Sequence, residues 1–197
     1  MQVNNMQSRV RSAFGSPFDR SDLPAGQAAV LIGLREPTCE LILTRRAAHL
    51  NSHAGEVAFP GGKFDPEDQS LVTTVLRETQ EEIGLDASAI ELVGMMPSRQ
   101  SRFGVNVFPF VGFVATDAIC TPNVAELDAV FEVPVQFFLD ASPKLEHQVK
   151  YQQQTYLFPC FYWQDQTIWG LTAYFIVEFM AHVFEKRIVW PEPRLLR

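Results

Sequence analysis

The order of apolar and polar positions along the chain predicts strands on both sides of one central helix. Apolar runs at 27–34 and 41–44 are separated by Glu36-Pro37, which is typical of two strands in a hairpin. A loop is expected at 47–56 and a short strand at 57–59. The remaining expected strands are 90–96, 105–114, 153–163 and 167–169.

The region between Gly62 and Gly84 predicts the central helix. Pro66 among acidic residues is a helix-start signal, and Gly84 is a suitable stop. An apolar stripe that can face a core runs along it: Val72, Val75, Leu76, Thr79 and Ile83. Short and amphipathic helices are expected at 135–140 and about 171–185, whereas 124–132 is expected to be irregular or a helical turn.

Three glutamates occupy another side of this helix. At about 100° per residue, Glu78, Glu81 and Glu82 fall within about 100° of arc. Like charges at these spacings repel by a few tenths of a kcal/mol per pair, roughly, and Arg77 neutralises only part of them. A hard divalent cation, Mg²⁺ or Mn²⁺, is their natural partner. An EF-hand loop is excluded, because Ser70 stands where its sharp turn needs glycine.

Composition and charge limit the classes of function. The chain has 197 residues, 47% of them hydrophobic and 20% charged, which suits one globular domain with a sizeable core. A net charge of −7 argues against nonspecific nucleic-acid binding, which needs a basic face. It permits an anionic small molecule, since a bound metal and a few arginines reverse the charge locally.

The cysteines and the apolar segments indicate the cellular compartment of the protein. The cysteines are odd in number and show neither a zinc spacing nor a disulfide framework, which favours a reducing compartment. Residues 1–20 contain no apolar leader, and 171–184 is too short and polar to span a bilayer. We expect a soluble cytoplasmic protein without a membrane partner, with an arm or short helix at 1–25 packed on a domain at 26–190.

Residues 61–85 resemble the Nudix box, G-x5-E-x7-R-E-U-x-E-E-x-G-U, in which U is a bulky aliphatic residue. The second half is matched by Arg77, Glu78, Thr79, Glu81, Glu82, Gly84 and Leu85. In the first half, Gly62 to Asp68 keeps the five-residue gap with Asp in place of Glu, and eight residues rather than seven precede Arg77. Three acids therefore stay candidates for the first acidic position: Asp65, Glu67 and Asp68.

This resemblance implies a fold and a reaction. The fold would be α/β, an α/β/α sandwich around a mixed sheet with a catalytic loop-helix-loop. The reaction would be metal-dependent hydrolysis of a diphosphate, with Glu78, Glu81, Glu82 and the Gly61 carbonyl as metal ligands. Glu78 or Glu81 would also orient or deprotonate the attacking water, and Arg77 would orient the glutamates.

The segment just upstream, LILTRRAAHLNSHAGEVAFPGG (41–62), is similar to the signature of the coenzyme A diphosphatase subgroup. That pattern is roughly L-L-T-x-R, then H-x-G-E, then F-P-G-G, and the subgroup's Nudix box is longer by one residue. Three later segments are also similar to it: 103–112, 123–134 and 168–173. The resemblance implies coenzyme A or its thioesters as substrate, with 4′-phosphopantetheine (or its acyl form) and adenosine 3′,5′-bisphosphate as products.

Several residues outside the helix are candidates for this substrate. The forked guanidinium groups of Arg45, Arg46 and Arg102 suit the three phosphates of coenzyme A. His53 either touches the substrate or holds its loop by hydrogen bonds. Glu126 is a candidate further acid near the metal site.

Two other functions stay open from the sequence. A Nudix enzyme can act on another diphosphate, such as ADP-ribose, a dinucleotide or a damaged nucleotide. A non-catalytic Nudix-fold module would bind a nucleotide for a partner protein, but such a module is expected to lose box carboxylates that this chain retains. A homodimer is possible for an enzyme and for a binding module.

Overall fold

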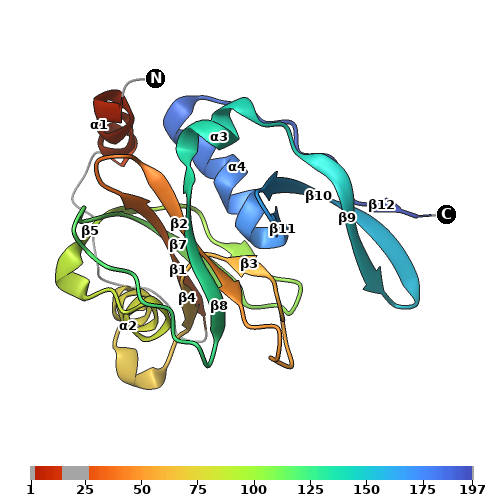
Figure 1. Cartoon of the computed structure of the whole chain (residues 1–197), viewed down its shortest axis with the longest axis horizontal. Coiled ribbons are helices and arrows are strands. Elements are labelled where there is room, and N and C mark those ends of the chain that lie inside the picture. Colours follow the sequence, from red (N-terminus) through yellow and green to blue (C-terminus); the bar gives the residue numbers. More distant parts are fainter. Residues whose placement is uncertain (1–2, 15–26, 197) are drawn as a thin grey trace. The chain divides into compact units, whose positions relative to one another are not determined.

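The structure is a computed structural model that describes residues 3–14 and 27–196. The chain forms two compact units, Met1–Pro134 and Val135–Arg197. Figure 1 shows the elements of both units in sequence colours. The first unit contains an eight-stranded sheet, and the second a four-stranded sheet.

The sheet of the first unit is mixed. Its main path runs β3-β2-β1-β7-β5, with β4 on β1, β6 on β7 and β8 on β2. Only the β1–β7 pair is parallel among these described pairings, and the others are antiparallel. The strands are β1 (Ala28–Arg35), β2 (Glu40–Arg46), β3 (Val57–Ala58), β4 (Gly61–Lys63), β5 (Ile90–Met95), β6 (Arg99–Gln100), β7 (Asn106–Val114) and β8 (Leu127–Pro134).

The two parallel strands lie inside the sheet, and their sequences reflect this position. Strand β1 reads AAVLIGLR, and six of its eight residues are buried. Strand β7 reads NVFPFVGFV and is buried continuously over its last six residues. Nearly unbroken apolar runs are expected where both faces of a strand are covered. These strands confirm the apolar runs identified from the sequence.

Helix α2 (Leu71–Ile83) packs on this sheet and positions the candidate site. The Ser70 side chain accepts a hydrogen bond from the Thr73 N–H and caps its start. Gly84, with a φ of 70°, ends it in the left-handed conformation that glycine favours. The core between helix and sheet includes Ala29, Leu31, Ile42, Leu71, Val72, Val75, Ile83, Phe110 and Val114.

Thr79 is a polar residue in the predicted apolar stripe, yet its buried hydroxyl has a hydrogen-bond partner. Thr79 is fully buried, and its hydroxyl donates to the Val75 carbonyl at 2.6 Å. Threonine therefore fits the position where the Nudix box has a bulky aliphatic residue.

The expectation for 124–132 was wrong. Most of it belongs to β8, which pairs antiparallel with β2 from Glu40↔Pro134 to Arg46↔Leu127. The burial of β8 does not alternate cleanly, and its partner strand lies about 85 residues earlier in the chain. This segment is a strand because it pairs with a distant strand, and the local sequence pattern does not reveal such pairing.

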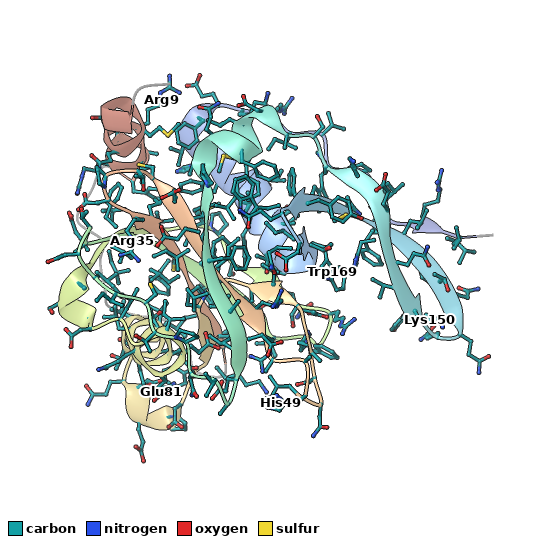
Figure 2. The ribbon with its side chains drawn as sticks, in the orientation of Figure 1. Arg9, Arg35, His49, Glu81, Lys150 and Trp169 are labelled. Atoms are coloured by element: carbon teal, nitrogen blue, oxygen red, sulfur yellow. The ribbon has the colours of Figure 1, made fainter. Side chains whose placement is uncertain are left out.

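The second unit combines a sheet with two helices. Its strands are β9 (Lys144–Tyr151), β10 (Gln154–Trp163), β11 (Gln166–Trp169) and β12 (Arg194–Leu195), and its helices are α3 (Val135–Asp140) and α4 (Gly170–Phe184). The late hairpin and both helices are confirmed, whereas β9 was missed. Lys150 lies near the end of the β9–β10 hairpin (Figure 2).

At the N-terminal end, helix α1 (Val3–Ala13) covers part of the expected arm; residues 15–26 lie outside the described part. The Arg11 guanidinium of α1 lies 4.5 Å from the Phe113 ring centroid. A single domain over 26–190 stays a prediction. Cys39, Cys120 and Cys160 are free thiols. Within residues 3–14 and 27–196, no helix is both long and apolar enough to cross a membrane.

Candidate active site

The candidate site begins at the glycine turn, Gly61 and Gly62, which are the first two residues of β4. Gly61 has a φ of 145°, and a Cβ at this position would lie 2.2 Å from the Ala29 carbonyl oxygen. A Cβ on Gly62 would lie 2.3 Å from the Glu78 carboxyl carbon. Gly61 therefore allows close contact with β1, and Gly62 leaves the space that the Glu78 carboxylate fills.

Glu82 is the most buried acid of the α2 cluster, with only 5% of its surface exposed. One carboxylate oxygen accepts the Gly61 N–H at 3.0 Å, and the other lies 3.8 Å from the Arg46 guanidinium. Burial raises the pKa of Glu82 to about 7, and the neighbouring negative charges of Glu78 and Glu126 act in the same direction. The helix thus presents a desolvated carboxylate to the glycine turn.

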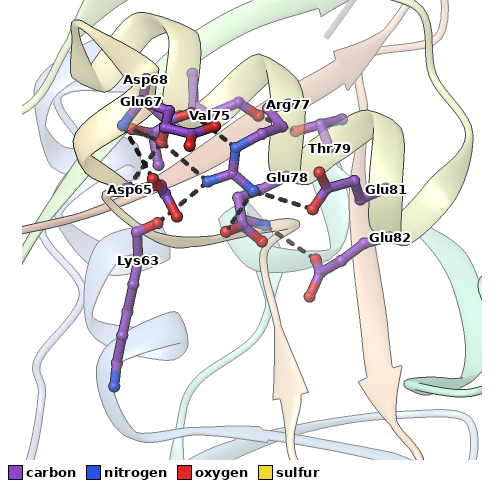
Figure 3. Close-up of polar contacts among 12 residues, drawn as sticks. Lys63, Asp65, Glu67, Asp68, Val75, Arg77, Glu78, Thr79, Glu81 and Glu82 are labelled. Carbon is purple, nitrogen blue, oxygen red and sulfur yellow. Dashed lines mark hydrogen bonds and ion pairs between the residues drawn. The ribbon is translucent and has the colours of Figure 1, made fainter.

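Arg77 connects the start of the box to its end, as Figure 3 shows. Its guanidinium donates to both carboxylate oxygens of Asp68, at 2.7 and 2.9 Å. One terminal nitrogen lies 3.0 Å from a Glu78 oxygen and 3.0 Å from a Glu81 oxygen. The Asp68 hydrogen bonds raise the pKa of Arg77, so the guanidinium stays charged. Arg77 is placed to orient these side chains.

Of the three acids left open for the first box position, Asp68 is the one in contact with Arg77. Asp68 is 3% exposed and also accepts hydrogen bonds from the Asp65 N–H and the Thr74 hydroxyl, at 2.9 and 2.8 Å. Asp65 caps the 3₁₀ helix η1 (Pro66–Asp68), while Glu67 is exposed. In this structure Asp68 therefore has a positioning role through Arg77.

The expected ligands lie close together but are held separately. Glu78 and Glu81 both pair with Arg77, whereas Glu82 binds the Gly61 N–H. Within the described residues, no three acidic, histidine or cysteine side chains gather around one point that could hold a metal ion. A shared metal site at Glu78, Glu81 and Glu82 thus stays a prediction.

Glu126 lies near this group from outside the helix. Its charge raises the pKa of both Glu78 and Glu82, although burial is the larger cause for each. The Glu126 carbonyl accepts the Ala47 N–H at 2.8 Å, which anchors it beside the end of β2. Glu126 lies in the turn just before β8, and this backbone hydrogen bond holds that turn beside the end of β2.

The charges and ligand atoms fit a hard divalent cation. Five carboxylates, from Asp68, Glu78, Glu81, Glu82 and Glu126, are only partly offset by two arginines, Arg46 and Arg77. Carboxylate oxygens are the ligands that Mg²⁺ and Mn²⁺ prefer, and Gly62 provides room for one of them. Burial raises the pKa of Glu78 as it does that of Glu82, so the charged form of both carboxylates lacks solvation and would be stabilised by a bound cation.

The remaining predicted substrate residues form a second group. His53 Nδ1 lies 2.6 Å from a Glu56 oxygen, and its ring meets the Phe103 ring edge-on at 5.5 Å. The Arg102 guanidinium lies over Phe103, 4.7 Å from the ring centroid. The Glu56 carbonyl accepts the Arg46 N–H at 3.0 Å, which links this group to Glu82.

Arg45 precedes Arg46 on β2 and pairs through the backbone with Val57. Phe103 was not among the predicted site residues. The available signal was an aromatic residue between Arg102 and Gly104 in a turn between two predicted strands.

A family model described as the NUDIX domain matches residues 24–150 of the chain. The chain belongs to the Nudix family. A Nudix hydrolase of Yersinia pestis (strain Pestoides F), NudL, is 43% identical over 153 residues, which are 75% of this chain and 74% of the relative. That relative is described as uncharacterized.

Solved structures give weaker matches. A Nudix hydrolase from M. smegmatis, RenU, is 18% identical over 60% of this chain and 76% of that chain, with a TM-score of 0.48. A C. elegans Ap4A hydrolase is 16% identical over 56% of this chain and 81% of that chain, with a TM-score of 0.47. Neither similarity bears on the substrate of this Nudix protein.

Family membership confirms the expected class of fold and enzyme. The mixed sheet with its helices is a Nudix fold of the α/β class, and the chain is a hydrolase acting on diphosphate bonds of nucleoside diphosphate derivatives. Nudix hydrolases generally use divalent ions such as Mg²⁺ or Mn²⁺.

The Asp68–Arg77 pair gives a prediction about stability. The Arg77 hydrogen bonds lower the pKa of Asp68 from 3.8 to about 2. Asp68→Asn should therefore cost about 2 kcal/mol of unfolding free energy at pH 7. A lowered pKa means that this stability is present above about pH 4 and is lost as the pH falls towards 2.

Urea denaturation of metal-free protein between pH 3 and pH 7 measures this difference. Glu67→Gln, an exposed neighbour, is the matched control and should change the unfolding free energy by less than about 0.5 kcal/mol. A cost for Asp68→Asn that stays constant over the whole pH range would show that the ion pair is not its source.

Proposed function

We propose that the chain hydrolyses the diphosphate bond of coenzyme A or acyl-coenzyme A. The products are 4′-phosphopantetheine, or its acyl form, and adenosine 3′,5′-bisphosphate. The supporting observation is the position of segment 41–62. It forms β2, the loop with His53, β3 and the glycine turn, so that Arg46 and Gly61 both contact Glu82.

The metal roles follow from the carboxylate cluster. Glu78 and Glu82, with Glu81 and the Gly61 carbonyl, would hold Mg²⁺ or Mn²⁺. A bound divalent ion supplies positive charge that neutralises diphosphate oxygens and lowers the pKa of a water molecule. Arg77 keeps Glu78 and Glu81 oriented through the contacts described above.

The reaction is a hydrolysis at one phosphorus of the diphosphate. A water oxygen forms a bond to phosphorus, the bridging P–O bond breaks, and each product leaves as a phosphate monoester. A carboxylate of α2, Glu78 or Glu81, accepts the water proton. Arg45, Arg46 and Arg102 stabilise negative charge on substrate phosphates, and Arg46 already contacts an acid of the cluster.

A substrate panel tests the proposal. Coenzyme A, acetyl-coenzyme A, ADP-ribose and a dinucleotide are incubated with the protein and Mg²⁺ or Mn²⁺, and the products are identified by mass. We expect kcat/KM for coenzyme A to exceed that for ADP-ribose by about tenfold or more, a difference of about 1.4 kcal/mol in transition-state binding. Turnover of ADP-ribose with negligible turnover of coenzyme A would refute the substrate while leaving the hydrolase class intact.

Other expectations stay predictions. They are the cytoplasmic location, the absence of nucleic-acid and membrane partners, and a homodimer.

A further inference from the structure

We propose that Phe103 stacks on the adenine base of the substrate and so adds base recognition to the diphosphate site. The proposal rests on the proposed function, which supplies an adenine nucleotide. It assigns a specificity role to a residue outside the Nudix box.

The loop that carries Phe103 is closed by backbone hydrogen bonds. It joins β6 to β7, and the Ser101 N–H donates to the Val105 carbonyl at 2.7 Å. The Gly104 N–H donates to the Ser101 carbonyl at 2.9 Å, and Gly104 takes a left-handed φ of 80°. This is a three-residue hairpin loop closed by glycine. Little conformational entropy is lost when such a loop binds a ligand.

The strand register brings this loop to the edge of the sheet where the carboxylates lie. Strand β7 starts next to the loop and runs parallel to β1, with Ala28 opposite Val107. Lys63, the last residue of β4, is paired with the same Ala28. The glycine turn and the Phe103 loop therefore share one edge of the first unit.

Phe103 itself is 65% exposed, which is high for a phenylalanine. The side chains of His53 and Arg102 contact the Phe103 ring. The His53 ring lies at 87° to it, and His53 is in turn held by Glu56. The Arg102 guanidinium lies 4.7 Å from the ring centroid. An exposed ring beside a guanidinium and an imidazole offers stacking surfaces and positive charge together.

This combination suits the adenosine half of the substrate better than the pantetheine half. Bases stack on aromatic side chains and on guanidinium planes, whereas the pantetheine arm is flexible and has no aromatic ring. Adenosine 3′,5′-bisphosphate also carries phosphates on both sides of its ribose, within the chemistry that an arginine beside the ring recognises.

Product inhibition separates the two halves. In Phe103→Leu, the inhibition constant of adenosine 3′,5′-bisphosphate should rise about tenfold or more, equivalent to about 1.4 kcal/mol and within the range for one stacked base. Inhibition by 4′-phosphopantetheine should stay within about twofold of wild type, because that product has no base. Ile119→Ala, a control at another exposed apolar residue (79%), should change neither constant.

A binding signal gives an independent readout. Phe103→Trp should show fluorescence quenching on titration with adenosine 3′,5′-bisphosphate or ADP-ribose, after subtraction of the wild-type signal from the three native tryptophans. Wild-type protein that fails to hydrolyse coenzyme A would refute the proposed function, while this titration would still decide the stacking. Absence of quenching, or equal loss of inhibition by both products in Phe103→Leu, would overturn the role of Phe103.

Discussion

Replacing Glu82 by glutamine should reduce kcat by about 10³-fold or more, because it removes the negative charge of the metal ligand that we propose at the centre of the carboxylate cluster. Glutamine keeps the size of the side chain and an oxygen that can accept the Gly61 N–H, whose distance to Glu82 is 3.0 Å. The loss would therefore reflect charge and metal binding rather than local unfolding. Steady-state kinetics on coenzyme A with saturating Mg²⁺ measure it.

Glu67→Gln is the matched control for this experiment. It changes the same functional group in the same loop-helix region, but Glu67 is exposed and takes no part in the ion pair of Arg77 with Asp68. Its kcat should stay within about twofold of wild type. Full activity in Glu82→Gln would instead show that this carboxylate of the Nudix box is not needed for hydrolysis.

Glu82→Gln should also make the metal-free protein more stable. The pKa of Glu82 is raised from 4.5 to about 7, so the folded state holds this proton more tightly than the unfolded state. Stability from Glu82 is fully present below about pH 4.5 and is lost as the pH rises through 7. At pH 8, Glu82→Gln should therefore gain about 1–3 kcal/mol of unfolding free energy relative to wild type. Loss of activity with gain of stability is typical of a site where function requires a buried charge.

The second large effect concerns the two adjacent glycines, which should respond differently to alanine. In Gly61→Ala, the new Cβ would lie 2.2 Å from the Ala29 carbonyl oxygen and 2.6 Å from the Val30 Cα, at a φ of 145°. Backbone atoms cannot move aside, so we expect a loss of about 3 kcal/mol or more. In Gly62→Ala, the three atoms nearest to the new Cβ all belong to the Glu78 carboxylate, with its carbon at 2.3 Å.

The Glu78 side chain can rotate away, so Gly62→Ala should cost less than about 1 kcal/mol of stability. Its kcat should nevertheless fall about 10- to 100-fold, because a displaced carboxylate no longer has its productive geometry. Thermal unfolding and kinetics on the two variants separate these effects. If Gly62→Ala retained wild-type kcat, the position of Glu78 would not matter for the reaction.

The central helix could be predicted from the sequence because its signals are local. The stop at Gly84 was predicted correctly, and the glutamate spacing follows from helical geometry. The predicted start at Pro66 was wrong, because Pro66 begins the separate 3₁₀ helix η1 and α2 begins after the Ser70 cap. The contact between Glu82 and Gly61 could not be derived in this way. It depends on packing of α2 against β4 and β1, which are separate in sequence.

The parts that the sequence did not reveal are those that depend on distant pairing. Strand β8 pairs with β2, and Glu126 lies in the turn immediately before β8, where its carbonyl accepts the Ala47 N–H. Strand β9 alternates exposed residues with half-buried Leu145, His147 and Val149, a period-two signal that was weakened by its charged residues. The position of Phe103 near the glycine turn depends on the pairing of β7 and β4 with the same end of β1, which the local sequence does not reveal.

Anomalous diffraction from crystals soaked in Mn²⁺ would test the metal site most directly. We expect manganese peaks within about 2.5 Å of carboxylate oxygens of Glu78 and Glu82, with the peak lost or weakened in crystals of Glu82→Gln. Manganese bound elsewhere, with both carboxylates turned towards solvent or held only by arginine in the soaked crystals, would contradict a carboxylate-bound divalent cation at α2.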